Sequence, residues 1–280
     1  MVRDVAQLLS QAHSLGVDRL DAQLLLAHRL GRTRTWLMAH AEAVVADPIA
    51  AIFEADCRSR TDDCPLAYLV GEREFYGLMF KVTPAVLVPR PDTETLVDWA
   101  AECVQAMPAA TPRLLDLGTG TGAIALSVLQ AVGQRLAHMT ATDVSAAALE
   151  VAAANAERLT MALEFQLGSW WHAVAGRRFD LVVSNPPYIA EGDAHLPALR
   201  HEPQLALTSG ADGLTALRQI VAGAPQHLNP GAWLLLEHGA DQAAAVRDLL
   251  LQRGFEAIQT RRDMGQRERC SGGQWPGRDL

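Results

Sequence analysis

The chain is poor in lysine, and this limits its partners. Its 280 residues contain a single lysine, Lys81, and carry a formal net charge of −8. Proteins whose main partner is DNA or RNA usually show a basic stripe, so the charge balance argues against a direct nucleic-acid substrate. Apolar runs are short of the roughly 18 residues that a membrane span needs, and residues 1–21 combine acids with helical periodicity instead of the apolar block of a signal peptide. We therefore expect no membrane association.

Patterns for disulfide or metal chemistry are also missing. The four cysteines form no CxxC pair, which favours reduced thiols in a cytoplasmic protein. His201-Glu202 begins like the zinc motif H-E-x-x-H, but Leu205 stands where the second histidine should be and Pro203 would break the helix. We expect no metal site, and surface or helix-capping roles for His201 and Glu202.

Residues 1–72 are predicted to form a small helical domain. Apolar residues recur there at helical spacing, at Leu8, Leu9, Ala12 and Leu15 and then at Leu20, Leu24, Leu25 and Leu26. Asp47-Pro48 indicates a helix start, with an acceptor at the N-cap and proline in the first turn. This part of the chain carries no chemical motif. We expect it to recognise the substrate, although a purely structural role is an equal alternative.

The remaining chain is predicted to be an α/β domain. Residues 73–90 alternate apolar and aromatic side chains around Gly77, which predicts a β-hairpin linker. Within residues 91–280, the expected strands are 113–117, 138–142, 162–167, 179–184, 232–237 and 255–260, and the expected helices are 122–132, 145–158, 213–227 and 240–252. Such alternation predicts a doubly wound, mostly parallel sheet with helices on both faces.

A glycine loop follows the first of these strands. Gly118, Thr119, Gly120, Thr121 and Gly122 give the spacing G-x-G-x-G, which lets the backbone approach a ligand closely. Asp143 ends the next strand, 143 − 122 = 21 residues beyond the last glycine. An acid at that position can accept hydrogen bonds from ribose hydroxyls. Helix capping is the alternative role for Asp143, but Ser145 could serve equally well as the cap.

The stretch FDLVVSNPPYI, residues 179–189, ends a strand abruptly. Proline lacks a backbone donor and has a fixed φ, so Pro186 and Pro187 stop the strand and stiffen the segment, and they push Asn185 toward extended geometry. Ligands of doubly wound sheets bind beyond the carboxyl ends of the strands, where strand order reverses. We therefore expect Asn185 to lie beside the glycine loop.

These motifs together resemble a known family. DLGTGTG, an acid after the second strand and NPPY after the fourth are similar to class I S-adenosylmethionine-dependent methyltransferases of amide or amino nitrogens. The wider pattern resembles the HemK/PrmC type, the glutamine methyltransferases of class 1 peptide chain release factors. It is carried by Phe75, Tyr76, Gly77, Arg90, Pro91, Thr93 and Glu94, and by residues 65–71, 202–203, 211–214 and 237–239.

The resemblance implies a seven-stranded methyltransferase fold and a set of site residues. The expected cofactor is S-adenosyl-L-methionine, which would leave as S-adenosyl-L-homocysteine. Its binding residues would be Gly118, Thr119, Gly120, Thr121, Gly122, Asp143, Trp170 and Asn185. The residues expected to act on the glutamine of the Gly-Gly-Gln motif, and so to support translation termination, are Asn185, Pro186, Pro187 and Tyr188. The chain departs from the family at Ser169, where an acid is common.

Three alternatives stay open at this point. The chain could methylate a glutamine of a ribosomal protein, or adenine N6 of a nucleic acid, or it could be a binding module without activity. The chain also carries its own Gly272-Gly273-Gln274. We expect this tripeptide to be held at the last strand of the sheet and not to be a substrate.

Overall fold

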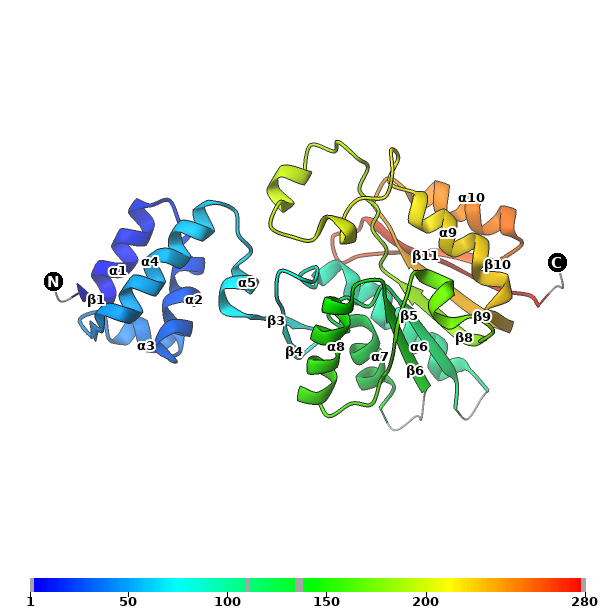
Figure 1. The fold of residues 1–280 in the computed structure, drawn as a ribbon, viewed down its shortest axis with the longest axis horizontal. Coiled ribbons are helices and arrows are strands. Elements are labelled where there is room, and N and C mark those ends of the chain that lie inside the picture. The colour runs from blue at the N-terminus through cyan, green and yellow to red at the C-terminus, as the bar shows by residue number, and fades with distance from the viewer. Residues whose placement is uncertain (1–2, 109–110, 134–137, 278–280) are drawn as a thin grey trace. The chain divides into compact units, whose positions relative to one another are not determined.

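A computed structural model of the chain describes residues 3–108, 111–133 and 138–277. The chain forms two compact units, drawn in Figure 1. The helical unit comprises Met1–Glu72 and Pro197–His201, and the α/β unit comprises Arg73–Leu196 and Glu202–Leu280. The segment Pro197–His201, expected in the α/β domain, thus belongs to the helical unit. Within the described residues, no helix is both long and apolar enough to cross a membrane.

The helical unit is built around a leucine-rich core. Its elements are β1 (Arg3–Asp4), α1 (Val5–Ser14), α2 (Arg19–Leu30), α3 (Arg34–Ala39), β2 (Val44–Val45), α4 (Asp47–Thr61) and α5 (Leu66–Val70). Asp4 and Gln7 form a reciprocal capping box at the start of α1. Leu8, Leu25 and Leu26 are fully buried, as the periodicity predicted.

Two of the apolar residues at helical spacing lie outside the core, and one detail of the helical prediction was wrong. Leu15 and Leu20 have 43% and 45% of their surface exposed. Leu15 is the C-cap of α1, and Leu20 lies in the first turn of α2. The N-cap of α4 is Ala46, without a side-chain cap bond, and Asp47 is the first helical residue.

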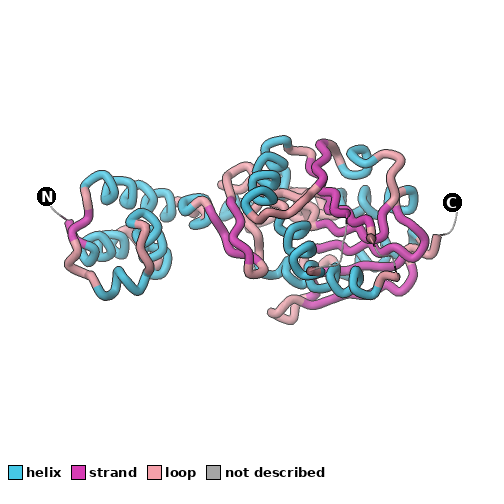
Figure 2. The backbone as a smooth tube through the Cα atoms, turned by 90° about the horizontal axis from the view of Figure 1, so that it is seen from below, coloured by secondary structure: helices cyan, strands magenta, loops and turns pink. Residues whose placement is uncertain are grey.

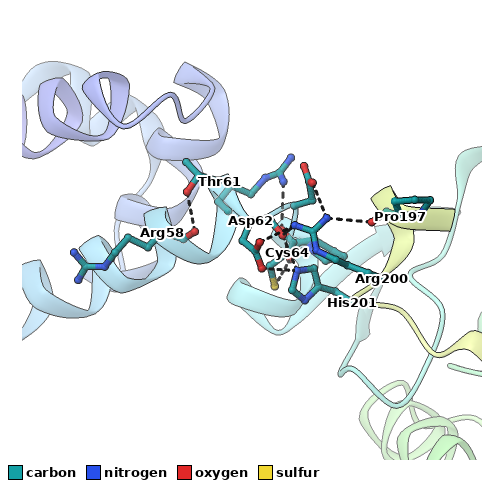
Figure 3. A network of polar contacts seen from close by, with 10 residues as sticks. Arg58, Thr61, Asp62, Cys64, Pro197, Arg200 and His201 are labelled. Carbon is teal, nitrogen blue, oxygen red and sulfur yellow. Dashed lines mark hydrogen bonds and ion pairs between the residues drawn. The ribbon is translucent and has the colours of Figure 1, made fainter. Parts of the chain in front are cut away.

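A polar network holds the segment Pro197–His201 within the helical unit (Figure 3). Arg200 donates to the carboxylate and the backbone carbonyl of Asp62 at 2.7 and 2.6 Å, and to Asp63 at 2.9 Å. His201 Nε2 lies 2.6 Å from the same carbonyl of Asp62. The hydrogen bond from Arg200 lowers the pKa of Asp62. Because these side chains are largely exposed, the network orients the segment more than it stabilises the unit.

The α/β unit contains the expected sheet. Within the described residues, seven strands run in the order β10-β11-β9-β8-β5-β6-β7, and they appear as adjacent strands in Figure 2. All neighbours pair in parallel except β11, which is antiparallel to both β9 and β10. The strands are β5 (Arg113–Leu117), β6 (His138–Asp143), β7 (Glu164–Leu167), β8 (Phe179–Ser184), β9 (Leu228–Glu237), β10 (Glu256–Arg262) and β11 (Glu268–Gln274).

Helices cover both faces of this sheet because successive strand residues point to opposite sides. On β5, Leu114 packs with α6 and α7, whereas Leu115 joins the core that includes α9 and α10. The helices are α6 (Glu94–Ala106), α7 (Ala123–Val132), α8 (Ala146–Arg158), α9 (Thr215–Gly223) and α10 (Ala243–Arg253). Short 3-10 turns are η1 (Pro91–Thr93), η2 (Trp170–Val174), η3 (Leu196–Leu199), η4 (Gln204–Ala206) and η5 (Ala224–Gln226). Each expected strand and helix has a counterpart among β5–β10 and α7–α10. Helix α6 was not among the expected helices.

The hairpin and the internal Gly-Gly-Gln also have clear places. Strands β3 (Glu72–Phe75) and β4 (Leu78–Lys81) form the hairpin, and residues 82–90 continue without strand structure. Gly272-Gly273-Gln274 ends β11, where Gln274 pairs with Trp233 of β9 and its side chain donates to the Gly231 carbonyl at 2.8 Å. The tripeptide is therefore held in the sheet, as expected.

Candidate active site

A cavity of about 440 Å³ lies beyond the carboxyl ends of β5, β6 and β8. Its walls combine the glycine loop after β5, the end of β6, the turn before η2 and the segment after β8. Eight of the predicted site residues line it, namely Gly118, Thr119, Gly120, Thr121, Asp143, Trp170, Asn185 and Pro187. The volume is in the range of small-molecule sites.

The pairing of β5 with β8 brings the two main motifs together. Leu117 and Ser184 are partners in register at the ends of these strands, and Ser184 Oγ donates to the Leu117 carbonyl at 2.7 Å. The residues that follow, Gly118 and Asn185, both line the cavity. The chain reaches β6 on one side of β5 and β8 on the other, so the cavity lies where strand order reverses. The prediction that Asn185 lies beside the glycine loop is confirmed.

Backbone contacts fix the glycine loop. Gly118 N and Thr119 N both donate to the Thr142 carbonyl of β6, at 2.9 and 2.8 Å. Gly120 has φ +54 and donates its N–H to Asp143 Oδ2 at 3.0 Å. A Cβ added at Gly120 would meet no atom within 4 Å, so the loop backbone there is open to close approach. Hydrogen bonds to β6 thus fix the loop, and its backbone at Gly120 is accessible from the cavity.

Asp143 is a partly buried acceptor and not the cap of α8. Its second oxygen accepts from Ser145 N at 2.9 Å, while Ser145 itself caps the helix through Ala148 N. Burial raises the pKa of Asp143 above its ordinary value, against the hydrogen bonds from Ser145 and Gly120. The capping alternative for Asp143 is therefore excluded by Ser145.

A second carboxyl lies beneath the loop. Asp116 is fully buried, and its Oδ2 accepts from Thr119 Oγ1 at 2.7 Å. Its Oδ1 has no hydrogen-bond partner among the described residues. Burial raises the pKa of Asp116 to about 7. At neutral pH Asp116 is therefore only partly ionised, and Asp143, which lines the cavity, is the main source of a negative potential that favours a cationic ligand.

The two tryptophans before β8 differ in their surroundings. Trp171 is buried, stacks on His227 and donates to the Ile220 carbonyl at 3.0 Å, so it belongs to the core. Trp170 lines the cavity, and its indole N–H donates to Gln219 Oε1 at 3.0 Å. A Cβ added at Gly118 would lie 3.5 Å from the Trp170 ring, in ordinary van der Waals contact, so the ring lies close to the glycine loop.

The segment after β8 is anchored at several points. Asn185 Nδ2 donates to Thr93 Oγ1 at 3.3 Å, and the Tyr188 hydroxyl donates to Glu237 Oε1 at 3.3 Å. Gln242 Nε2 donates to the Tyr188 carbonyl at 2.9 Å. These bonds join elements far apart in the sequence, so the stiffness conferred by the two prolines is supported by tertiary contacts.

Three predicted site residues lie outside the cavity wall. Gly122 is the N-cap of α7 and lies close to Ala152 of α8. The Pro186 ring is buried under the segment, and Tyr188 is directed to Glu237. The backbone of Gly122 and the side chains of Pro186 and Tyr188 therefore support the residues that line the cavity.

Comparison with known proteins places this geometry in a family. The methyltransferase small domain model matches residues 94–202, and the PrmC N-terminal domain model matches residues 1–71. A release factor glutamine methyltransferase of Bordetella pertussis is 50% identical over 265 residues, 92% of this chain and 95% of that protein. The chain belongs to the release factor glutamine methyltransferase family.

Two solved structures are similar in fold to large parts of this chain. A methyltransferase from Pyrococcus furiosus has a TM-score of 0.53 at 19% identity and covers 79% of this chain and 98% of its own. The 16S rRNA N2 G1207 methyltransferase of T. thermophilus, solved with AdoMet and guanosine, has a TM-score of 0.54 at 20% identity and covers 72% of this chain and 49% of its own. At these identities the likeness concerns the fold alone.

The family motifs outside the cofactor loop have structural partners that sequence reasoning did not assign. Glu94 accepts from Tyr76 N at 3.1 Å. Glu202 is 5% exposed, forms an ion pair with Arg90 and accepts from Val88 N at 3.1 Å. The expected surface or capping role of Glu202 is therefore wrong, because this carboxylate is buried against the segment that precedes η1.

No metal cluster accompanies these acids. In the part of the chain that the structure describes, no group of three or more His, Cys, Asp or Glu side chains is arranged to hold a metal ion.

Gly213 offers a test of how tightly Tyr188 is held. A Cβ at Gly213, which has φ +73, would lie 2.2 Å from the Tyr188 carbonyl oxygen and 2.8 Å from Gln242 Nε2. Gly213→Ala should therefore break the bond between these groups in addition to straining the backbone, and lower the free energy of unfolding by about 2–4 kcal/mol.

The matched control is Gly192→Ala. Gly192 has φ +83 but open space around its Cβ position, so this variant carries the backbone strain alone, about 1–2 kcal/mol. Denaturant unfolding of the two variants measures the difference. Equal losses of stability would contradict a clash at Tyr188.

Proposed function

We propose that the chain transfers a methyl group from S-adenosylmethionine to the side-chain amide nitrogen of the glutamine in the Gly-Gly-Gln motif of class 1 release factors. The observation that carries the proposal is the adjacency of Asn185 and the glycine loop in one cavity. A cofactor loop and an amide acceptor at one site are what a glutamine methyltransferase needs. The 50% identical relative from Bordetella pertussis is a release factor glutamine methyltransferase, which supports the choice of substrate. The free, unpaired cysteines are consistent with action in the cytoplasm.

The cavity fits the proposed cofactor. We assign Asp143 to the ribose hydroxyls, the backbone of Gly118–Thr121 to the amino-acid part, and Trp170 to the adenine ring, with Ser169 as a further polar group at its edge. The negative potential of Asp143, with a part from the half-ionised Asp116, suits a ligand with a sulfonium and an ammonium group. When bound, S-adenosylmethionine supplies an electrophilic methyl group and leaves as S-adenosylhomocysteine. The fold neighbour solved with AdoMet supports this choice.

Asn185 and Pro186 would orient the target amide. The lone pair of an amide nitrogen is delocalised into the carbonyl, so the nitrogen is a poor nucleophile. Asn185 Oδ1 and the Pro186 carbonyl would accept from its two N–H groups, fixing the nitrogen in line with the methyl and favouring the positive charge that develops on it. One proton then leaves, and the product keeps one N–H. A neutral acceptor also avoids the ion pair that an aspartate at position 185 could form with the sulfonium.

Pro187 and Tyr188 would keep these acceptors rigid. Pro187 lines the cavity next to Asn185, while Tyr188 fastens the segment to Glu237 and, through its carbonyl, to Gln242. The acceptors then need no reorganisation during the reaction. We therefore assign Tyr188 a supporting role behind the two acceptors.

We also propose that the helical unit recognises the release factor. All residues that line the cavity belong to the α/β unit, and the helical unit has a core of its own. A separate unit without a share in the site is suited to binding a macromolecular substrate.

The substrate assignment is tested with labelled cofactor. Purified enzyme, methyl-labelled S-adenosylmethionine and a release factor should give one labelled peptide that contains the Gly-Gly-Gln glutamine, and a release factor with that glutamine changed to alanine should give none. Label in ribosomal protein instead would favour the sister activity. Label in adenine of a nucleic acid would overturn the protein-substrate proposal.

Asn185→Ala should lower kcat by about 100-fold or more, because a group that positions the amide in the transition state is lost. Cofactor affinity should stay close to that of the wild type. Single-turnover kinetics and calorimetric titration measure the two effects. Near-normal turnover would contradict the acceptor role of Asn185.

Asp143→Ala should instead weaken S-adenosylmethionine binding by about 1–3 kcal/mol, since charge-assisted hydrogen bonds are lost. Glu150→Ala removes an exposed acid from the neighbouring helix α8 and serves as the control. If titration gives both variants the affinity of the wild type, the ribose role of Asp143 is wrong.

Deletion of residues 1–72 should leave cofactor affinity largely intact and abolish methylation of the intact release factor. The deletion also removes Asp62 and Asp63, the partners of Arg200. Full-length Arg200→Ala therefore controls for the loss of that network and should remain active. Equal rates for truncated and full-length enzyme on the intact release factor would refute the recognition role.

A further inference from the structure

Thr93 occupies the N-cap position of α6 without capping it. Threonine at this position usually accepts a backbone N–H from the first helical turn. The side chain of Thr93 makes no such bond, although it is only 5% exposed and lies at the cavity wall. Its hydroxyl interacts with side chains from two other segments instead.

The chemistry of the hydroxyl and the carboxylate decides which group donates and which accepts. A hydroxyl has one proton to donate and lone pairs that accept, whereas a carboxylate only accepts. The Thr93 hydroxyl also lies near the carboxylate of Glu237 and lowers the pKa of that acid, which directs the threonine proton to Glu237. The lone pair of the hydroxyl then faces Asn185, which meets it with the nitrogen end of the carboxamide, at 3.3 Å from Nδ2 to Oγ1.

We propose that Thr93 is a positioning residue, which transmits the polarity of the buried Glu237 to Asn185 and holds the Asn185 carboxamide with Oδ1 left to accept from the target. The two ends of a carboxamide have nearly the same shape, so packing alone distinguishes them poorly. Turned by half a rotation, Asn185 would present N–H groups to the N–H groups of the glutamine. The inference rests on the proposed function for the identity of the target and on the hydrogen bonds for the orientation.

The surroundings of Glu237 favour its role as a fixed acceptor. The Tyr188 hydroxyl donates to Oε1, and Oε2 has no partner among the described residues. Arg269 of β11 attracts the carboxylate, and Asp92 of η1 repels it. Cys270 of β11 pairs with Glu237 in register, and burial raises the pKa of its thiol. Among the groups that face Glu237, Arg269 favours its charged form and Asp92 opposes it, while the hydroxyls of Thr93 and Tyr188 interact with the carboxylate as donors.

Protonation of Glu237 should remove this constraint. Burial raises the pKa of Glu237 to about 7, against the hydrogen bond from Thr93 and the charge of Arg269, which lower it. Below that pH the carboxyl gains a proton and can itself donate to Thr93. The threonine proton is then free to turn to Asn185, and the preference for one carboxamide orientation is lost. Activity should therefore fall on the acid side of neutrality.

Kinetics of three variants test the role of Thr93. Thr93→Val keeps the shape and removes the hydroxyl, and kcat on the release factor should fall by about 10- to 100-fold, with KM for cofactor and substrate changed by less than about 3-fold. Thr93→Ser restores the hydroxyl and should recover most of the loss. Thr95→Val makes the same change two residues away and should retain the rate of the wild type.

The pH profile adds a readout that a packing role would not change. Glu237→Gln cannot titrate, so the acid limb that the wild type shows below about pH 7 should flatten in this variant. Asp116 also has a pKa raised to about 7, and its contribution to the limb would persist. An unchanged acid limb in Glu237→Gln would contradict the link to Asn185.

A substrate-independent measurement separates this inference from the proposed function. In ¹⁵N-labelled enzyme, the side-chain NH₂ signal of Asn185, assigned by its loss in Asn185→Ala, should exchange slowly with solvent. Thr93→Val should accelerate that exchange, and Thr93→Ser should not. If the wild type leaves the release factor unmodified, the proposed function fails while this exchange still tests the orientation. Exchange and kcat in Thr93→Val equal to those of Thr95→Val would overturn the inference.

Discussion

The parallel pairing of β5 with β8 is the contact on which the site depends. It aligns the ends of the two strands, with the Ser184 hydroxyl bonded to the Leu117 carbonyl, so that the glycine loop and Asn185 begin at the same level. A shift of one residue would turn Leu117 and Ser184 to opposite faces and separate the two motifs. The buried leucines of β5 oppose such a shift on both faces of the sheet. Core packing therefore determines where the methyl donor and its acceptor would meet.

A second constraint is the buried polar chain behind the cavity. Asn185 and Tyr188 belong to the segment after β8, and Thr93 and Glu237 come from two other segments. Hydrogen bonds of 3.3 Å join Asn185 to Thr93 and Tyr188 to Glu237. Buried groups of this kind stabilise little on balance, because burial disfavours a carboxylate that lacks a strong partner. Their contribution lies in orientation, since each hydrogen bond fixes the direction of the next. The two prolines restrict the backbone conformation of residues 185–188, and the polar contacts restrict the orientation of the Asn185 side chain. Both acceptors proposed for the amide are therefore fixed before substrate binds.

Local patterns allowed much of this to be predicted from the sequence. The strand before the glycine loop, the acid 21 residues beyond it and the proline-stopped strand at Asn185 each depend on neighbours in the chain, and the resemblance supplied the family. The partners of Arg90 and Thr93 could not be predicted in this way. Glu202 lies 112 residues from Arg90, and Asn185 lies 92 residues from Thr93, and periodicity carries no information on contacts of that separation. The segment Pro197–His201 was assigned to the wrong unit for the same reason, because its partners Asp62 and Asp63 are distant in sequence.

The most direct test of this account is a crystal structure of the enzyme with S-adenosylhomocysteine and a release factor. The account predicts that the amide nitrogen of the target glutamine lies about 3 Å from both Asn185 Oδ1 and the Pro186 carbonyl oxygen. It also predicts that Asn185 Nδ2 remains on Thr93. A target amide bound elsewhere in the cavity, or an Asn185 that presents its nitrogen to the target, would contradict the account.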